Sequence, residues 1–233
     1  MMIYFNWGDF MKILFLGTGA ADFPADKSDV IGFRRTSSAL IDNKILIDPG
    51  PWVLDAIKEY GVDASKIKYI LNTHRHSDHY CQETVDFLAT KGAKLIETRD
   101  KDTLSFDGYT VEAYKANHTI ETCHFIIKNA ETCLFYGLDG AWLQYEEIRA
   151  IWKNKPDLAV FDATVGFIEK DWRVFEHNNL NMVIEMKKSI DKDIKKYVIS
   201  HMAYTLHTDH ETLSKEMAKH GIVTAYDGME IEF

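Results

Sequence analysis

The sequence is poor in cysteine and contains no long apolar run. Its three cysteines, Cys81, Cys123 and Cys133, are widely spaced and form no Cys-x-x-Cys pair. This spacing excludes a disulfide framework and a zinc knuckle, so we expect three small buried apolar side chains. No stretch approaches the roughly 18 apolar residues of a membrane span, and residues 1–10 lack the features of a signal peptide. We therefore expect a cytoplasmic protein without a membrane partner.

Positive charge is also scarce, because 27 Lys and Arg residues stand against 36 Asp and Glu residues and give a formal charge of -9. This excess argues against a protein that wraps nucleic acid, so we expect no nucleic-acid partner. It does not exclude a small anionic substrate, since a local cationic site can oppose the net charge. A chain of 233 residues buries roughly 70% of its unfolded surface without a metal. Any metal cluster would therefore serve chemistry.

Apolar runs and glycine turns predict strands that first pair locally and then alternate with helices. Residues 13–16 form a buried strand that ends at Gly17, and a hairpin turns at Asp42 and Asn43. Strands are predicted at 38–41, 44–47, 67–71, 93–97, 110–114, 124–128, 132–137, 158–161 and 196–199, with an extended segment at 223–233. Helices are predicted at 51–60, 79–90, 142–152, 180–189 and 211–220. This order indicates one domain over residues 11–233, with two sheets flanked by helices, and an extension at residues 1–10 without an assigned role.

Three histidines and one aspartate lie within six residues, His74-Arg-His76-Ser-Asp78-His79. His74 and His76 are two residues apart on an extended segment, so their rings point the same way and can share one metal ion. Asp78 and His79 are predicted at the start of the next helix, where they can serve a second ion. A solvated polar turn is the alternative, but buried imidazoles need partners. This ligand set suits zinc, manganese or iron and does not select among them.

The pattern His-x-His-x-Asp-His resembles the signature of the metallo-β-lactamase superfamily. The resemblance extends to FLGTGA at 15–20, ILIDPGP at 45–51 and ISHM at 199–202. It implies a mixed α/β (α+β) fold, the four-layer αββα sandwich. Among the subfamilies, the chain is similar to PhnP-like phosphodiesterases (phosphoribosyl 1,2-cyclic phosphate phosphodiesterase) in LFYGLDGA at 134–141, EHNNLNM at 176–182 and AYDGMEI at 225–231. It departs from them because its cysteines cannot reproduce their cysteine-rich structural zinc site.

The same resemblance implies the remaining metal ligands, one position at a time. His118 would complete the histidine set of the first ion, and His201 would join Asp78 and His79 at the second. Asp139 would be the carboxylate that bridges the two ions. Asp162 is its rival for that role, although a position behind the ligands suits Asp162 better.

These residues imply a dinuclear metal-dependent hydrolase. Its expected reaction is attack by a metal-bridging hydroxide on the phosphorus of a small phosphodiester, linear or cyclic. His177 is the candidate proton donor to the leaving oxygen and a candidate substrate-binding residue; its alternative role is a rim histidine that orients its neighbours. Asp78 is implied to move protons while it binds metal. The resemblance also implies a homodimer.

Other functions stay open on the same ligands: a lactone or ester hydrolase, a ribonuclease Z-like RNA endonuclease, or a non-catalytic metal-binding protein. The acidic composition and the lack of a basic arm count against the endonuclease. Arg34 and Arg35 precede a predicted strand and could reach a phosphate, but we favour solvated or ion-paired roles for both. For His207 and His210 we favour surface or capping roles.

Overall fold

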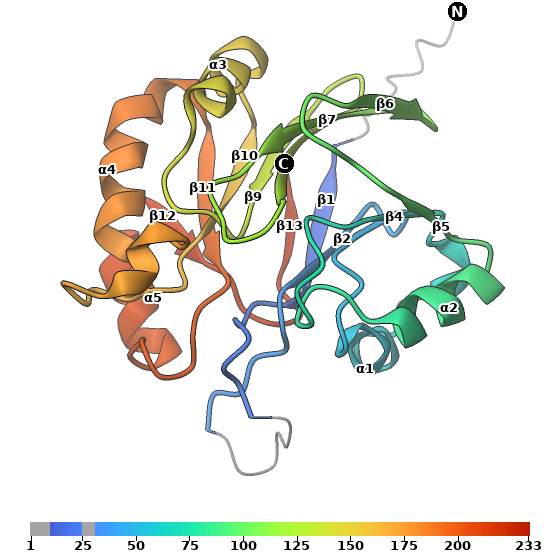
Figure 1. The fold of residues 1–233 in the computed structure, drawn as a ribbon, viewed down its shortest axis with the longest axis horizontal. Coiled ribbons are helices and arrows are strands. Elements are labelled where there is room, and N and C mark those ends of the chain that lie inside the picture. Colours follow the sequence, from blue (N-terminus) through green and yellow to red (C-terminus); the bar gives the residue numbers. More distant parts are fainter. Residues whose placement is uncertain (1–9, 25–30) are drawn as a thin grey trace, which may run out of the picture.

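Two β-sheets pack face to face between outer layers of helices (Figure 1). The structure, a computed structural model, describes residues 10–24 and 31–233. The extension predicted at residues 1–10 therefore lies outside the described residues, except for Phe10. In spatial order, the first sheet contains β13 (Glu230–Glu232), β1 (Lys12–Gly17), β2 (Ser38–Ile41), β3 (Ile45–Ile47), β4 (Tyr69–Leu71) and β5 (Lys94–Ile96).

The second sheet is antiparallel at one side and parallel at the other. In spatial order it contains β12 (Ile222–Thr224), β11 (Lys196–Ser200), β10 (Leu158–Asp162), β9 (Cys133–Gly137), β8 (Cys123–Lys128), β7 (Tyr109–Lys115) and β6 (Thr103–Phe106). Strands β9 to β12 run parallel, so their carboxyl ends meet at one edge of the sheet. Side chains that follow these strands are thereby brought together.

The helices cover the outer faces of the sheets. Helices α1 (Val53–Glu59) and α2 (Gln82–Thr90) lie against the first sheet, and α3 (Tyr145–Asn154), α4 (Leu180–Ile190) and α5 (His210–Ala218) lie against the second (Figure 1). Short 3₁₀ turns occur at Ala64–Lys66, Trp172–Phe175 and Asp191–Asp193. One apolar cluster fills the space between the sheets, and one more lies under each helical layer. The predicted αββα sandwich is confirmed.

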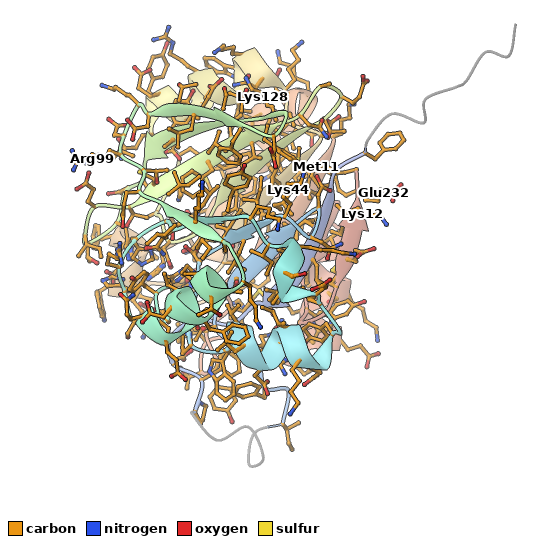
Figure 2. All side chains as sticks on the ribbon, turned by 90° about the vertical axis from the view of Figure 1, so that its right-hand side faces the viewer. Met11, Lys12, Lys44, Arg99, Lys128 and Glu232 are labelled. Atoms are coloured by element: carbon orange, nitrogen blue, oxygen red, sulfur yellow. The ribbon has the colours of Figure 1, made fainter. Side chains whose placement is uncertain are left out.

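Local sequence accounts for the hairpin between β2 and β3. Asp42 and Asn43 have φ angles of 50° and 55°, a left-handed conformation that these two residue types tolerate in tight turns. At the open edge of the same sheet, Lys12 on β1 and Glu232 on β13 lie together (Figure 2), with 3.3 Å between Nζ and Oε2. Charges of this kind discourage further strand pairing at an edge.

Two features of the fold differ from the prediction. Strand β6 was not expected, because its four residues are only partly buried and carry no strong apolar run. Helix α2 begins at Gln82 and not at His79, so Asp78 and His79 lie in a turn. The reason is a contact with a distant part of the chain: the Cys81 N–H donates to the Pro49 carbonyl oxygen, which keeps residue 81 extended and delays the helix. Within the described residues, no helix is long and apolar enough to cross a membrane.

Candidate metal centre

All seven residues predicted as metal ligands converge where the two sheets meet. Each follows a strand end: the histidine-rich segment follows β4, and the others follow β7, β9 and β11. Their nitrogen and oxygen atoms form overlapping groups that could each hold an ion, namely His74, His76 and His118; Asp78, His79 and His201; and His74, His79 and Asp139. The structure thus brings together every predicted ligand, and their metal-binding role stays a prediction.

The first group is made of three imidazoles. His74 Nε2 lies 2.9 Å from His76 Nδ1, and His118 Nε2 lies 3.2 Å from the same His76 atom. The His74 side chain is buried, whereas His76 and His118 face the pocket. Three ring nitrogens at this separation repel one another through their lone pairs unless protons or a cation lie between them.

The second group joins two imidazoles and a carboxylate. His79 Nε2 lies 3.1 Å from His201 Nε2 and 3.2 Å from Asp78 Oδ2. Asp139 lies between the two groups: its Oδ1 is 3.1 Å from His201 Nε2, and its Oδ2 is in contact with His79 Nε2 and 3.5 Å from His74 Nε2. One carboxylate therefore faces both sets of nitrogens.

Acceptors behind the rings determine which nitrogens face the centre. His79 Nδ1 donates to Asp48 Oδ2 at 2.8 Å, and His118 Nδ1 donates to the Glu176 carbonyl oxygen at 3.1 Å. Thr73 Oγ1 lies 2.9 and 3.0 Å from the two oxygens of Asp48 and donates its hydrogen there, so it accepts from His74 Nδ1. When each ring is neutral, its Nε2 is therefore the nitrogen with the free lone pair, as metal coordination requires.

Asp139 and Asp162 differ in how their oxygens are used. Asp162 accepts hydrogen bonds from the backbone N–H groups of Thr164 and Asn178 and from His177. Both oxygens of Asp139 are buried and have no hydrogen-bond partner among the described residues. Orphaned buried carboxylate oxygens carry a large free-energy cost. Divalent cations between these oxygens and the converging lone pairs would remove that cost, so the residues fit the metal ions that the resemblance implies.

His177 lies at the rim of the same pocket. Its Nδ1 is 2.7 Å from Asp162 Oδ2 and 3.1 Å from Thr164 Oγ1, and its ring stacks on His201 at a centroid separation of 5.5 Å. Burial alone would lower the pKa of His177, but the charge and hydrogen bond of Asp162 raise it to about 9. The structure thus places Asp162 behind His177, which agrees with the interpretation that Asp162 supports the site from behind.

The surroundings of the centre lower the pKa of one buried histidine and raise the pKa of another. Burial and the neighbouring His79 lower the pKa of His74 to about 2, so His74 is neutral. Burial also disfavours a charge on His79, but Asp139, Asp48 and Asp78 raise its pKa well above the ordinary value. The carboxylates thus create a site of strong negative potential that favours cations.

Three residues at this centre adopt a strained backbone conformation. Asp48, Asp139 and His201 have φ angles of 60°, 56° and 62°, a left-handed conformation that costs on the order of 1 kcal/mol for residues with a side chain. Each of them directly follows a strand or lies within two residues of a strand end. The surrounding packing holds these turns, which direct the three side chains inward.

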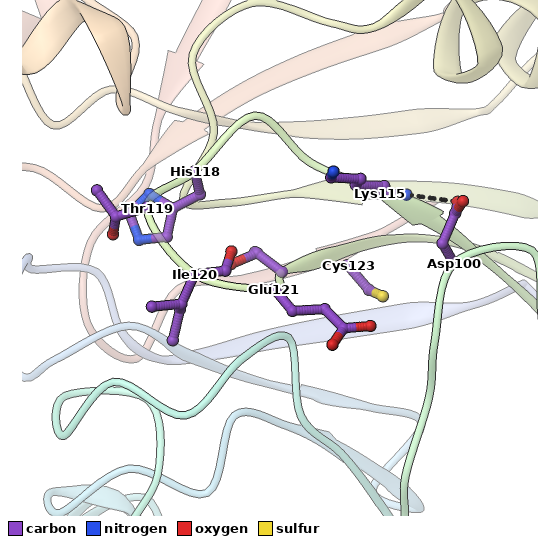
Figure 3. Close-up of a pocket in the computed structure, with 8 residues that line it drawn as sticks. Asp100, Lys115, His118, Thr119, Ile120, Glu121 and Cys123 are labelled. Atoms are coloured by element: carbon purple, nitrogen blue, oxygen red, sulfur yellow. Dashed lines mark hydrogen bonds between the residues drawn. The ribbon is translucent and has the colours of Figure 1, made fainter.

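Two cavities share His118 on their linings. The metal pocket, of about 260 Å³, is lined by His76, Asp78, Asp139, His177 and His201 among others. A second cavity, of about 410 Å³, lies beyond His118 (Figure 3), where the Lys115 N–H donates to Asp100 Oδ1 at 3.0 Å. Cys123 lines the second cavity, and burial raises the pKa of its thiol to about 11. A thiol with this pKa is not a nucleophile at neutral pH.

Several expectations about other residues can be compared with the structure. Cys123 and Cys133 are buried, as expected, whereas Cys81 is partly exposed; no cysteine forms a disulfide. Arg35 is ion-paired, as favoured. The residues that the sequence analysis did not select are Asp48, Thr73 and Thr164, which orient the ligand histidines. The signal for Asp48 was its place directly after a strand, in the segment ILIDPGP.

Comparisons with known proteins agree with this geometry. Residues 31–82, which include His74 to His79, match the family model described as the metallo-beta-lactamase superfamily. No curated protein sequence matches the chain. Among solved structures, the metallo-beta-lactamase fold protein YhfI from Bacillus subtilis is 18% identical, with a TM-score of 0.76 over 97% of this chain and 100% of its own.

Two further structures share the fold at similar distance. A diphosphatase from the PhnP family is 16% identical, with a TM-score of 0.74 over 96% of this chain and 98% of its own. Zn(2+)-bound PqqB from Methylobacterium extorquens is 15% identical, with a TM-score of 0.74 over 95% and 100% of the two chains. At these identities the likeness establishes the architecture alone. The chain as a whole therefore has the metallo-beta-lactamase fold, and its residues 31–82, with the His-x-His-x-Asp-His segment, match the model of the metallo-beta-lactamase superfamily.

Proposed function

We propose that this protein is a hydrolase that uses two divalent metal ions, zinc, manganese or iron, to cleave a small phosphodiester, linear or cyclic. The observation that carries the proposal is the buried carboxylate of Asp139, which has no hydrogen-bond partner among the described residues and faces converging imidazole nitrogens on both sides. Without cations, a buried carboxylate in this arrangement carries a large free-energy cost. The arrangement is typical of a carboxylate that binds two metal ions.

Each residue of the centre has a defined task in this proposal. His74, His76 and His118 would hold one ion, Asp78, His79 and His201 would hold the other, and Asp139, which lies between the two groups, would serve both. Divalent ions bound there would act as Lewis acids on a phosphate oxygen and make hydroxide available near neutral pH. Asp48 and Thr73 keep the lone pairs of His79 and His74 directed at the ions.

His177 is the proposed proton donor to the leaving oxygen. Because Asp162 and Thr164 occupy its Nδ1, its Nε2 is the nitrogen that remains for a substrate in the pocket. Asp162 holds the ring in one orientation and favours its protonated form. A protonated imidazole at the rim can neutralise the alkoxide that departs from phosphorus.

Phosphodiester chemistry is favoured over other hydrolyses by two observations. The pocket combines a candidate proton donor for an alkoxide with a cationic side chain, Arg173, on its lining. The shared fold also occurs in a protein described as a diphosphatase from the PhnP family. Lactone or thioester hydrolysis, RNA cleavage and metal binding without turnover are the other outcomes of the test below.

The test is hydrolysis of bis(p-nitrophenyl) phosphate by manganese-loaded protein. We expect release of p-nitrophenol by the wild-type protein and by Asp86→Ala, which changes an exposed aspartate on α2. Asp139→Ala should abolish the activity, because it removes the carboxylate shared by the two sites. A protein shown to hold two metal ions but inactive on this diester, while active on lactones, thioesters or RNA, would overturn the proposal.

A further inference from the structure

The segment between β10 and α4 forms a loop whose two ends lie side by side. Val165 and Asn179 form a parallel bridge, and the Val165 N–H donates to the Asn178 carbonyl oxygen at 3.0 Å. These contacts close residues 166–178 into a compact surface loop. Loops of this type pack on their own side chains and frequently carry function. This loop ends beside His177, the proposed proton donor.

Two contacts tie the end of the loop to the metal centre. The Glu176 carbonyl oxygen accepts from His118 Nδ1 at 3.1 Å, and the Asn178 N–H donates to Asp162 Oδ1 at 3.2 Å. His118 is a proposed ligand, and Asp162 supports the centre from behind. The loop therefore has a defined position at the rim of the metal pocket, and so do the side chains exposed on it.

Within the loop, the 3₁₀ turn Trp172–Phe175 presents different side chains to the pocket and to solvent. Side chains three residues apart lie above one another in a 3₁₀ helix. Arg173 and Glu176 are three apart, and both line the metal pocket. Trp172 and Phe175 are also three apart, so they share the neighbouring face of the turn, where they are 66% and 80% exposed. We call these two residues the aromatic pair.

The aromatic pair is continuous with the pocket lining through Arg173. The guanidinium carbon of Arg173 lies 5.9 Å from the centre of the Trp172 ring. Arg173 Nε donates to Asp171 Oδ1 at 3.0 Å, which holds the guanidinium in this position. A cation over one face of an indole leaves the opposite face for an apolar or aromatic group. A ligand that extends out of the pocket past Arg173 would therefore meet the Trp172 ring.

Apolar exposure extends along the same loop. Phe167 and Ile168 are also exposed, so the loop carries four large apolar side chains that contact solvent. Exposed apolar groups gathered beside a pocket mark a surface that a ligand or partner covers. Flat rings favour a flat partner, because aromatic groups stack with an offset or pack edge to face.

The position of His177 on the loop indicates which part of a substrate lies there. In the proposed reaction the hydroxide oxygen forms a new bond to phosphorus, and the bond between phosphorus and the alcohol oxygen breaks. The proton of His177 Nε2 passes to that departing oxygen, so the products are a phosphate monoester and the free alcohol. The alcohol therefore leaves on the His177 side of the pocket, where the loop carries the aromatic pair.

We propose that Trp172 and Phe175 bind the alcohol portion of the substrate, and that the preferred substrate is a phosphodiester of an aromatic alcohol. This inference rests on the proposed function, because it assigns a leaving group to that reaction. The aromatic pair contacts the alcohol away from the reacting atoms, so it determines specificity.

The first test compares two leaving groups. Methyl 4-biphenylyl phosphate and methyl phenyl phosphate release phenols of similar acidity that differ by one ring, which extends out of the pocket. The wild-type protein should prefer the biphenylyl compound about tenfold in kcat/KM, mainly through KM. The Trp172→Ala/Phe175→Ala double variant should lose this preference and keep its activity on methyl phenyl phosphate. Phe87→Ala, which changes an aromatic residue 40% exposed on α2, should behave as wild type.

The second test measures binding without turnover. In isothermal titration calorimetry, 4-phenylphenol should bind the metal-loaded wild-type protein. Its Kd should rise at least about fivefold in the double variant and stay unchanged in Phe87→Ala. Circular dichroism and elemental analysis check that each variant is folded and holds its metal.

The two proposals fail in different ways. If methyl phenyl phosphate is hydrolysed and the folded double variant keeps the wild-type preference and the wild-type Kd, the role of the aromatic pair is wrong and the proposed function stands. If no phosphodiester is hydrolysed but 4-phenylphenol binding depends on the aromatic pair, the proposed function is wrong and the pair stands as a site for aromatic alcohols.

Sedimentation of the wild-type protein and the double variant, alone and with phosphatidylcholine vesicles, tests the other occupants of this surface. The inference predicts the same sedimentation for both proteins under both conditions. Self-association or vesicle binding that the double variant loses, together with an unchanged leaving-group preference, would overturn the inference and make the aromatic pair an interface.

Discussion

Asp48 illustrates, at the scale of single residues, how a side chain behind the ligands determines the chemistry of the centre. It is fully buried and accepts from His79 Nδ1, from Thr73 N at 2.7 Å and from Thr73 Oγ1. It thereby fixes His79 directly and His74 through Thr73. Carboxylates in this position raise the basicity of a ligand imidazole and hold its tautomer.

Asp48→Asn should therefore weaken metal binding about 10–100-fold. The amide can still accept one hydrogen bond, but it lacks the charge that supports both histidines. Competition with a chromophoric chelator measures the affinity, and the exposed Asp86→Asn is the matched control. An unchanged affinity in folded Asp48→Asn would show that Asp48 has only a structural role.

His177→Gln should lower kcat on a phosphodiester about 10²–10⁴-fold, the usual contribution of a positioned acid. The bound metal should stay at the wild-type stoichiometry, because His177 is not one of the proposed ligands. Steady-state kinetics and elemental analysis of the same sample measure both quantities. Loss of metal together with activity would instead make His177 a ligand, as its inclusion in a group with Asp139, Asp162 and His201 allows.

At the scale of elements, a buried pair ties β8 and α3 to the turn that carries Asp139. His124 on β8 contacts Glu147 on α3 through Nδ1 and donates Nε2–H to the Leu138 carbonyl oxygen at 3.0 Å. Both partners are acceptors, so the ring is an imidazolium. Burial alone would lower the pKa of His124, but the charge of Glu147 raises it above the ordinary value.

Glu147→Gln should destabilise the fold by about 3–5 kcal/mol, because it leaves a buried cation without its anion. Because the folded-state pKa of His124 is raised, the contribution of this pair is fully present below the unfolded-state pKa of 6.5 and declines as the pH rises through the folded value. The variant should lack this pH dependence. Urea unfolding in the presence of a chelator measures both effects.

The neighbouring Glu146→Gln is the control for this prediction. Glu146 is exposed and pairs with Arg149 on the helix surface at 3.5 Å. Its loss should change the free energy of unfolding by less than about 0.5 kcal/mol. Equal effects of the two substitutions would contradict the importance of the buried pair.

The elements also show which parts of the structure the sequence can predict. Continuous apolar runs, as in β1, β9 and β10, predict buried strands because burial on both faces needs apolar residues throughout. Strand β6 was not predicted from the sequence, because its pairing to β7, and not its own composition, makes it a strand. The start of α2 depends on a contact between Cys81 and Pro49, two residues far apart in the sequence.

The candidate site follows the same division. His74, His76, Asp78 and His79 were predicted from their spacing in one segment, whereas His118, Asp139 and His201 were implied by the resemblance to the metallo-β-lactamase superfamily. Asp48 was not predicted, because an aspartate after a strand cannot be distinguished from an ordinary turn residue until its hydrogen-bond partners are known. Arg34 and Arg35 are adjacent and identical in type, so only the fold can tell that one is saturated by carboxylates and the other is not.

At the scale of the whole molecule, the fold brings together a set of side chains that could bind cations. Bound ions should therefore stabilise the native state. The seven proposed ligands come from loops after both sheets, so bound ions connect the two halves of the sandwich. The unfolded chain cannot assemble these groups, and binding to the native state alone shifts the unfolding equilibrium.

Removal of the ions by a chelator should therefore lower the unfolding midpoint. For each ion at about 100-fold above its dissociation constant, the lost stabilisation of about 2.7 kcal/mol corresponds to about 5–10 °C in a chain of this length. Differential scanning calorimetry with and without chelator measures the shift. Asp139→Ala should show a smaller shift, and a wild-type midpoint indifferent to the chelator would argue against ions held by both sheets.

The central claim is that Asp139 joins two metal sites, and anomalous X-ray scattering from a crystal of the zinc-loaded protein tests it most directly. The account predicts two zinc peaks, one among His74, His76 and His118 and one among Asp78, His79 and His201, with the Asp139 carboxylate between them. A single peak, or peaks coordinated by Asp162 in place of Asp139, would contradict it.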